Sequence, residues 1–106
     1  MQVFATDGEP RAHEALGTLT ASIGFTSTYY VYGGLPMKAA LLTVEDADIR
    51  FCIDGTTPVV TGAGEKGHIM SSGQSYVIRG CEACRNFRMI NAVNSNGATA
   101  KATYFY

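Results

Sequence analysis

Three groups of residues in this chain have the types and the spacing that could support chemistry. The first is Cys81-Glu82-Ala83-Cys84, in which two thiols stand three positions apart. Thiolates at this spacing can bind zinc, but a structural zinc site needs a full tetrahedral set of ligands. The remaining candidates, Cys52, His13 and His68, form no second pair in the sequence. A redox pair usually stands at a strand-to-helix step, whereas strand, turn and strand are expected here. The pattern therefore favours two small structural side chains.

The second group is acidic and surrounds one predicted loop. Its members could offer oxygens to calcium, or two of them could act as a general acid and base. The spacing of a calcium-binding loop is absent, and an acid and base pair needs a cleft that holds the carboxyl groups in different environments. The sequence therefore favours solvated carboxylates for Glu45, Asp46, Asp48 and Asp54.

The third group is the glycine-rich stretch at residues 61–67, which has the composition of a phosphate-binding loop. It lacks the GxxxxGK[ST] spacing and precedes no predicted helix, so a hairpin loop explains it better. The two histidines are isolated, and no Gly-x-Ser-x-Gly motif occurs in the sequence. We therefore expect a protein that is not an enzyme and that holds no cofactor or metal.

The elements that would position these residues are predicted to be short strands. Apolar and polar residues alternate at 39–45 and again at 49–53, as in strands with one buried face. The connection at 45–48 has a loop length common in hairpins, so the two strands are expected to pair with each other. Arg50 and Asp48 are expected on the face opposite to Phe51. The side chains expected to hold the core together are Leu42, Val44, Phe51 and Ile53.

Further strands are predicted nearer the C-terminal end of the chain, at residues 75–79, 85–90 and 98–106. Residues 80–83 are expected to form a turn or crossing, and Asn94-Ser95-Asn96-Gly97 is a strong turn signal. Small edge segments are expected at 58–60 and 68–70. About five to eight short strands with no long helix predict an all-β fold, namely a single small antiparallel β-sandwich or jelly-roll-like barrel.

Residues 1–36 are predicted to be an extended N-terminal segment, either an arm or edge strands. Within it, residues 11–16 could form one or two helical turns that Gly17 would end. Residues 18–32 are rich in Thr, aromatic and β-branched side chains, which favours a strand. Residues 37–106 are predicted to be the β-sandwich core, and the 106 residues together are expected to be one domain.

Composition and charge argue against several classes of protein. With 46% hydrophobic residues, 16% charged residues and a net charge of −1, the chain is globular in composition. Its eight Lys and Arg residues are spread along the sequence, which argues against nucleic-acid binding. No apolar run approaches the ~20 residues of a membrane-spanning helix, and no signal peptide is recognisable. We expect synthesis in a cytoplasm, reduced cysteines and no membrane partner.

Tyrosines and one arginine are the best candidates for an association surface. Tyr is enriched where one end of the side chain is packed and the other is wet, as at protein interfaces and sugar-binding surfaces. A chain of this length buries only roughly 60–70% of the surface of its unfolded state, which is a reason to expect oligomers. The candidate interaction residues are Tyr29, Tyr30, Tyr32, Arg50, Tyr104 and Tyr106.

The chain also carries a series of motifs in a recognisable order. These are ALLTVEDADIRFCIDGTTP, then a glycine-rich loop with GHIMSSGQSYVIRG, then RNFRMI, and finally the Thr/Tyr-rich strand ATAKATYFY. In this order the motifs resemble small virion proteins of tailed bacteriophages. The resemblance covers about two thirds of the chain, leaves residues 1–36 outside, and shows Cys81-x-x-Cys84 as a local departure.

The resemblance implies a structural role and no catalytic residues. Proteins of this group are similar in role to head decoration (cement) proteins or neck components, and are commonly β-sandwich or jelly-roll trimers. For this chain it implies a homotrimer on the outer surface of the virion capsid, with the major capsid protein as its partner. The alternative is a neck, tail or fibre-associated β-sandwich that recognises a receptor or glycan.

Overall fold

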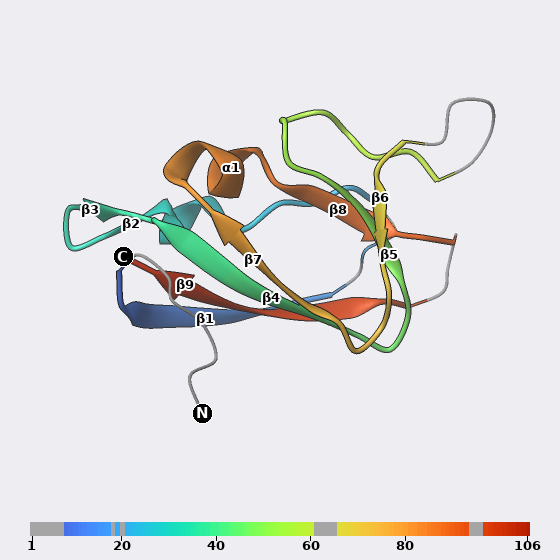
Figure 1. Ribbon diagram of the computed structural model, residues 1–106, viewed down its shortest axis with the longest axis horizontal. Coiled ribbons are helices and arrows are strands. Elements are labelled where there is room, and N and C mark those ends of the chain that lie inside the picture. Colours follow the sequence, from blue (N-terminus) through green and yellow to red (C-terminus); the bar gives the residue numbers. More distant parts are fainter. Residues whose placement is uncertain (1–7, 18, 20, 61–65, 94–96) are drawn as a thin grey trace.

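Most of the regular structure in the chain is antiparallel β-strand, which confirms the all-β prediction (Figure 1). The computed structural model describes residues 8–17, 19, 21–60, 66–93 and 97–106. Within these residues, the helical elements are the 3-10 turn η1 (Ser27–Tyr30) and the helix α1 (Cys81–Asn86). The strands are β1 (Pro10–Leu16), β2 (Val31–Tyr32), β3 (Leu35–Pro36), β4 (Ala39–Glu45), β5 (Ile49–Cys52), β6 (His68–Met70), β7 (Ser75–Arg79), β8 (Arg88–Asn91) and β9 (Thr99–Phe105).

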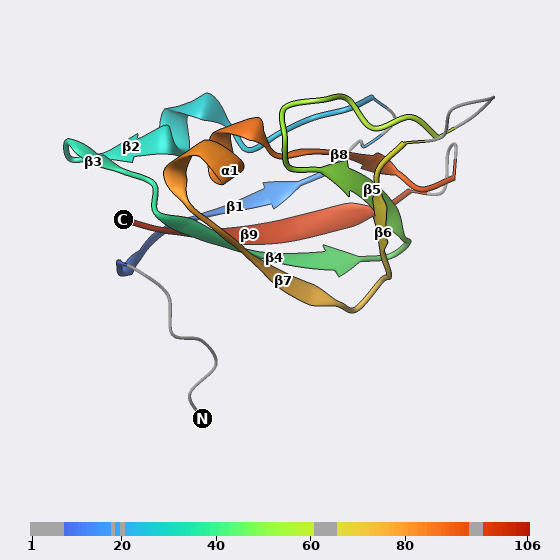
Figure 2. The same cartoon turned by 45° about the horizontal axis from the view of Figure 1, so that its top comes forward.

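Four strands form the larger sheet, in the order β1-β9-β4-β7. Strand β9 lies inside this sheet and pairs with β1 on one side and β4 on the other (Figure 2). Its alternation buries Ala100, Ala102 and Tyr104 and leaves Lys101 exposed. Leu42 pairs with Ala102, so a large side chain stands beside a small one. This difference in size lets side chains of the two sheets interdigitate.

A second sheet of three strands, in the order β6-β5-β8, faces the first across one hydrophobic core (Figure 2). Ile49 and Met89 enter the core from this sheet and are fully buried. At one end of the core, Phe25 stacks on Phe87 with the ring centroids 4.7 Å apart, and meets Tyr104 edge-on. Burying a large apolar side chain is worth about 1.5–3 kcal/mol, so this cluster holds the two sheets together.

The connection between β4 and β5 is an arch and not the hairpin expected from the sequence. Strand β4 pairs with β7 and β9, whereas β5 pairs with β6 and β8, so the chain passes from one sheet to the other at residues 46–48. Asp46 makes the turn with a φ of 72°. The alternation of β4 is confirmed by the burial of Leu42 and Val44, but Ile53, expected in the core, is 40% exposed.

The described residues of the N-terminal segment pack on the same hydrophobic core as the rest of the chain. Residues 10–16 form the edge strand β1, so the helical turns considered for residues 11–16 are absent. The prediction of a strand at 18–32 is wrong over most of the described part of this segment. The segment contains a bridge from Ile23 to Met89, then η1 and the two residues of β2. A Cβ on Gly24 would lie 2.6 Å from the Phe87 carbonyl oxygen, so the chain passes too close to β8 for a regular side chain. Leu16 and Phe25 join the common core.

Two smaller expectations change near the C-terminal end. Residues 81–86 are helical, where a turn and the start of a strand were expected, and the strand begins only at Arg88. The segment at 68–70 is β6, as expected, while Val59 makes a single bridge to Lys66. Most of the expected turn at 94–97 and of the glycine-rich stretch at 61–67 lies outside the described residues.

Candidate interaction surface

An apolar hairpin projects from one end of the molecule (Figure 1). Strands β2 and β3 pair Val31 with Pro36 and Tyr32 with Leu35, and Gly33-Gly34 forms the turn with φ values of 56° and 83°. Two successive positive φ values are the signature of the hairpin turn that suits twisted strands, and glycine adopts them without strain. Val31, Tyr32 and Leu35 are 49%, 47% and 43% exposed. We call Val31, Tyr32, Leu35 and Pro36 the hairpin tip.

The base of this hairpin is fixed to the larger sheet. The Met37 amide donates to the Tyr30 carbonyl at 2.8 Å, and the Lys38 amide donates to the Phe105 carbonyl at 2.7 Å. The Tyr32 ring lies 5.2 Å from the Tyr106 ring, measured between centroids. The apolar tip is therefore presented in one orientation relative to the core.

The five candidate tyrosines do not form one surface. Tyr104 is fully buried and Tyr106 is only 3% exposed, which corrects the expectation that both belong to an association surface. Tyr29 and Tyr30 are half-buried, and the Arg85 guanidinium stands 5.6 Å above the Tyr30 ring. Tyr32, in the hairpin tip, is the most exposed of the five.

The two C-terminal tyrosines have hydrogen-bond partners inside the molecule. The Tyr104 hydroxyl donates to the Glu14 carboxylate on β1, and the Tyr106 hydroxyl donates to the Tyr29 carbonyl at 2.5 Å. Burial raises the pKa of Tyr104 far above its usual range, and the hydrogen bond to Glu14 raises it further. Burial also raises the pKa of Tyr106. Both phenols stay protonated, as structural donors.

Arg50, the remaining candidate, supports a loop. It is half-buried, and its guanidinium donates to the Gly67 carbonyl at 2.9 Å. A Cβ on Gly67 would lie 3.2 Å from Pro58 and 3.3 Å from Arg50, so residues 58 and 67 cover this side of β5. Arg50 is therefore held by this loop and is only partly open to solvent, although its pairing partner on β6, Ile69, is 49% exposed.

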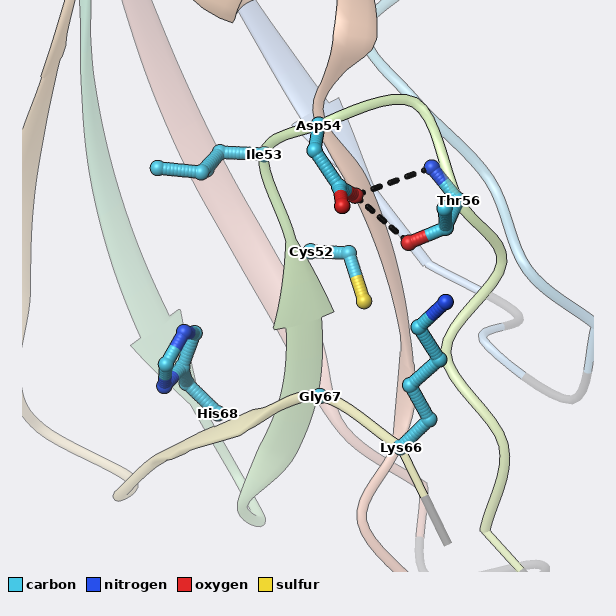
Figure 3. A pocket seen from close by; sticks show the side chains of 7 residues that line it. All are labelled: Cys52, Ile53, Asp54, Thr56, Lys66, Gly67 and His68. Atoms are coloured by element: carbon cyan, nitrogen blue, oxygen red, sulfur yellow. Dashed lines mark hydrogen bonds between the residues drawn. The ribbon is translucent and has the colours of Figure 1, made fainter. Parts of the chain in front are cut away.

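A pocket of about 320 Å³ lies between the end of β5 and the start of β6, lined in part by Cys52, Asp54, Lys66 and His68 (Figure 3). Asp54 accepts hydrogen bonds from the Thr56 hydroxyl and amide, which lower the pKa of its carboxyl group. The His68 ring packs on Phe51, with 5.5 Å between centroids, and lies across β5 from the Cys52 thiol in the view shown. The pocket therefore does not place the Cys52 thiol beside the His68 imidazole, as a nucleophile and its general base would require.

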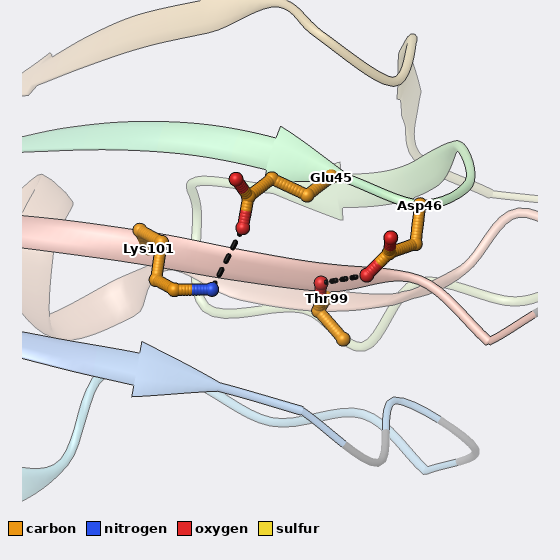
Figure 4. A network of polar contacts seen from close by, with 4 residues as sticks. All are labelled: Glu45, Asp46, Thr99 and Lys101. Carbon is orange, nitrogen blue, oxygen red and sulfur yellow. Dashed lines mark hydrogen bonds and ion pairs between the residues drawn. The ribbon is translucent and has the colours of Figure 1, made fainter.

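The acidic residues of the arch serve the fold. Glu45 forms an ion pair with Lys101 at 2.7 Å, and Asp46 accepts a hydrogen bond from the Thr99 hydroxyl at 2.5 Å (Figure 4). Asp48 accepts from the Ser72 amide at 2.8 Å. Among the described residues, no group of three or more His, Cys, Asp and Glu side chains is placed to hold a metal ion.

The thiols of Cys81-x-x-Cys84 both lie on α1 and are not joined in a disulfide. The Cys84 thiol is buried and donates to the Ile78 carbonyl at 3.5 Å. Burial raises the pKa of Cys84 to about 12. Since the thiolate is the form that attacks electrophiles and binds metals, Cys84 is a packing residue that ties α1 to β7.

Comparison of the chain with protein-family models, with curated proteins and with solved structures finds no match. In the part of the chain that the structure describes, no helix is long and apolar enough to cross a membrane. The sequence predicted Tyr32 as a contact residue but did not predict the hairpin tip to which it belongs. The signal for the hairpin is in the sequence, because Gly33-Gly34 between Val31-Tyr32 and Leu35-Pro36 has the pattern of a tight hairpin.

Proposed function

We propose that this protein is a structural component of a tailed-bacteriophage virion that binds the outer surface of the major capsid lattice and stabilises it. The observation that carries the proposal is the exposed hairpin tip, with three apolar side chains that are each more than 40% exposed. Contiguous apolar surface on a small protein usually marks an interaction site. The resemblance of residues 39–106 to small phage virion proteins supplies the class of partner.

The shape of the hairpin suits docking onto a preformed surface. Its base is hydrogen-bonded to the larger sheet through Lys38 and Phe105, so few degrees of freedom are lost when the tip is covered. Tyr32 adds a ring whose hydroxyl can remain wet while the ring is buried. Burying apolar area contributes about 25 cal/mol per Å² before the cost of association.

The stabilising mechanism is mass action on the assembled shell. A protein that binds the closed lattice, and not the separated capsid subunits, shifts the equilibrium toward the lattice. The gain per occupied site is RT ln(1 + [L]/Kd), where [L] is the concentration of free protein. No chemical step is required of the bound protein.

Cryo-electron microscopy of the virion of the phage that encodes this chain tests the proposal. We expect density for the two-sheet domain on the outside of the head, with the β2–β3 hairpin against the shell. Density confined to the portal, the neck or the tail would overturn it.

A matched pair of variants tests the role of the hairpin tip. Changing Tyr32→Ser and Leu35→Ser together should abolish co-sedimentation with capsids that lack the protein, because the apolar contact is removed. Ile69→Ser on β6 removes an equally exposed apolar side chain, 49% exposed, and should leave co-sedimentation unchanged. Equal loss in both variants would argue against the hairpin tip as the contact.

Receptor or glycan binding is the second candidate function, favoured by the exposed ring of Tyr32. One side of this ring packs on Tyr106, and 47% of the residue remains open to solvent. Exposed tyrosine rings can stack on sugars. A glycan array should then give signals that Tyr32→Ser removes, and an array at background would rule this function out.

A further inference from the structure

Strand β7 is the least protected of the four strands that end the two main sheets in the described part of the chain. The β1 edge begins with Pro10, carries an irregularity between Pro10 and Ala12, and is charged. Prolines, irregularities and charges are the features that stop an edge strand from pairing further. The open edge of β8 is covered in part, because the backbone groups of Met89 and Ile23 exchange hydrogen bonds. Strand β6 has only three residues. Strand β7 has five residues, no proline and one charge, at its end.

The backbone of β7 offers hydrogen-bonding groups on its open side. The Gly80 amide donates to the Lys38 carbonyl, in the register that pairs Ile78 with Ala40 and Tyr76 with Leu42. In an antiparallel pair, alternate residues bond to the same neighbour. The amide and carbonyl groups of Ser75 and Val77 therefore point away from β4.

A pocket lies beside β7, between this strand, α1 and the chain that follows β5. It has a volume of about 350 Å³ and is lined by Ile53, Tyr76, Val77, Ile78, Arg79 and Ala83. Tyr76 points to the same side of the sheet as the buried Leu42, its pairing partner, yet it is 43% exposed. The exposure of Tyr76 marks the place where one more strand would complete the core.

We propose that the occupant of this edge is β7 of a second copy of the chain, running antiparallel about a two-fold axis through Val77. In this register Val77 faces the second Val77, and Tyr76 stands beside Ile78 of the other copy. Arg79, the single charged residue of β7, faces Ser75 and not another arginine. The strand is thus self-complementary in hydrophobicity and charge, as a two-fold interface requires.

The result is one continuous eight-stranded sheet with both Tyr76 side chains covered. This dimer is an alternative to the trimer that the resemblance implies, because a strand that pairs with its own copy forms a closed two-fold contact. The inference does not depend on the capsid role, since it rests on β7 alone.

Opposite charges at position 77 give a direct test. Sedimentation velocity of the wild-type protein at micromolar concentrations should give twice the chain mass of 11.3 kDa. Val77→Glu and Val77→Lys should each weaken the dimer by about tenfold or more, because like charges then face each other across the axis. An equimolar mixture of the two variants should restore the dimer. Ile69→Glu, on the exposed edge strand β6, should leave it intact.

A wild-type measurement covers the case in which the charged variants fold poorly. Hydrogen exchange at the Ser75 and Val77 amides should slow as protein concentration rises, while exchange in β6 should not change. A wild-type monomer throughout this range, a trimer, a dimer indifferent to both charged variants, or exchange at Val77 independent of concentration would each overturn the proposal.

Discussion

Tyr104 shows how one side chain can connect three parts of the molecule. Tyr104 is fully buried on the central strand β9, and its hydroxyl donates a hydrogen bond to Glu14 on β1. Its ring packs edge-on against Phe25, which lies in the segment after β1. A buried phenol is tolerated only because its hydroxyl has a partner. The residue suggested from the sequence as a surface contact is therefore central to stability.

Stability should fall at alkaline pH, and Tyr104 should account for part of the fall. Above pH about 10 an unfolded tyrosine loses its proton, whereas burial and Glu14 raise the pKa of folded Tyr104 and keep it protonated. The unfolded state then binds fewer protons than the native state, so the free energy of unfolding decreases as the pH rises. Urea unfolding across this pH range should show that the free energy of unfolding decreases less steeply with pH in Tyr104→Phe. At neutral pH this variant should be less stable than the wild-type protein by about 1–2 kcal/mol. Identical slopes in both proteins would contradict the assignment.

Burial of single residues was predictable only within a strand. The alternation in β4 correctly placed Leu42 and Val44, because every second residue of a regular strand faces the core. Ile53 departs from its pattern because β5 ends at Cys52 and the chain turns. Arg50 is half-buried because the loop at Gly67 lies against it. Such cover comes from loops, which periodicity does not describe.

The arch between β4 and β5 illustrates the limit of local pattern for whole elements. A short polar connection between two alternating strands fits a hairpin and an arch equally well, since both need the chain to reverse direction. The choice depends on β9 and β7, which occupy both sides of β4 and leave no place for β5. These partners are distant in the sequence, so the connection itself held no signal for the arch.

Substitutions at Asp46 should separate the two roles of this residue in the arch. Its φ of 72° favours glycine, while its carboxylate accepts from the Thr99 hydroxyl. Asp46→Ala loses the hydrogen bond and keeps the unfavourable φ, whereas Asp46→Gly loses only the bond. Thermal and urea unfolding should therefore show Asp46→Ala to be less stable than Asp46→Gly by about 1 kcal/mol. The reverse order would mean that the turn does not hold this conformation in solution.

At the scale of the whole molecule, the fold class was predictable and the sheet order was not. Short strands separated by glycine-rich turns indicate an all-β protein. The order β1-β9-β4-β7 joins residues such as His13 and Thr103, which lie at opposite ends of the chain. The strands share the same alternation of apolar and polar residues. Many different strand orders would therefore satisfy the sequence pattern equally well.

The central position of β9 predicts that the fold can be divided and restored. A fragment of residues 1–96 should be largely unfolded, because β1 and β4 both lose the strand that joins them. Adding a peptide of residues 97–106 should restore the circular dichroism spectrum of the intact protein. The same peptide with Tyr104→Lys should fail, because an unpaired charge would enter the core. A folded 1–96 fragment without peptide would show that β9 is dispensable.

The place of the hairpin tip relative to β7 has a consequence for avidity. Strand β3 leads into Ala39, which pairs with Arg79, so the hairpin lies beyond the C-terminal end of β7 (Figure 2). In the proposed antiparallel dimer these ends point in opposite directions, and the two tips stand at opposite extremities. Such a dimer is bivalent: once one tip is bound, the other meets its site at a high effective concentration if the spacing fits. If the tips bind the capsid lattice as proposed, the repeat distance of sites on the lattice, more than the strength of either contact, determines where the protein binds.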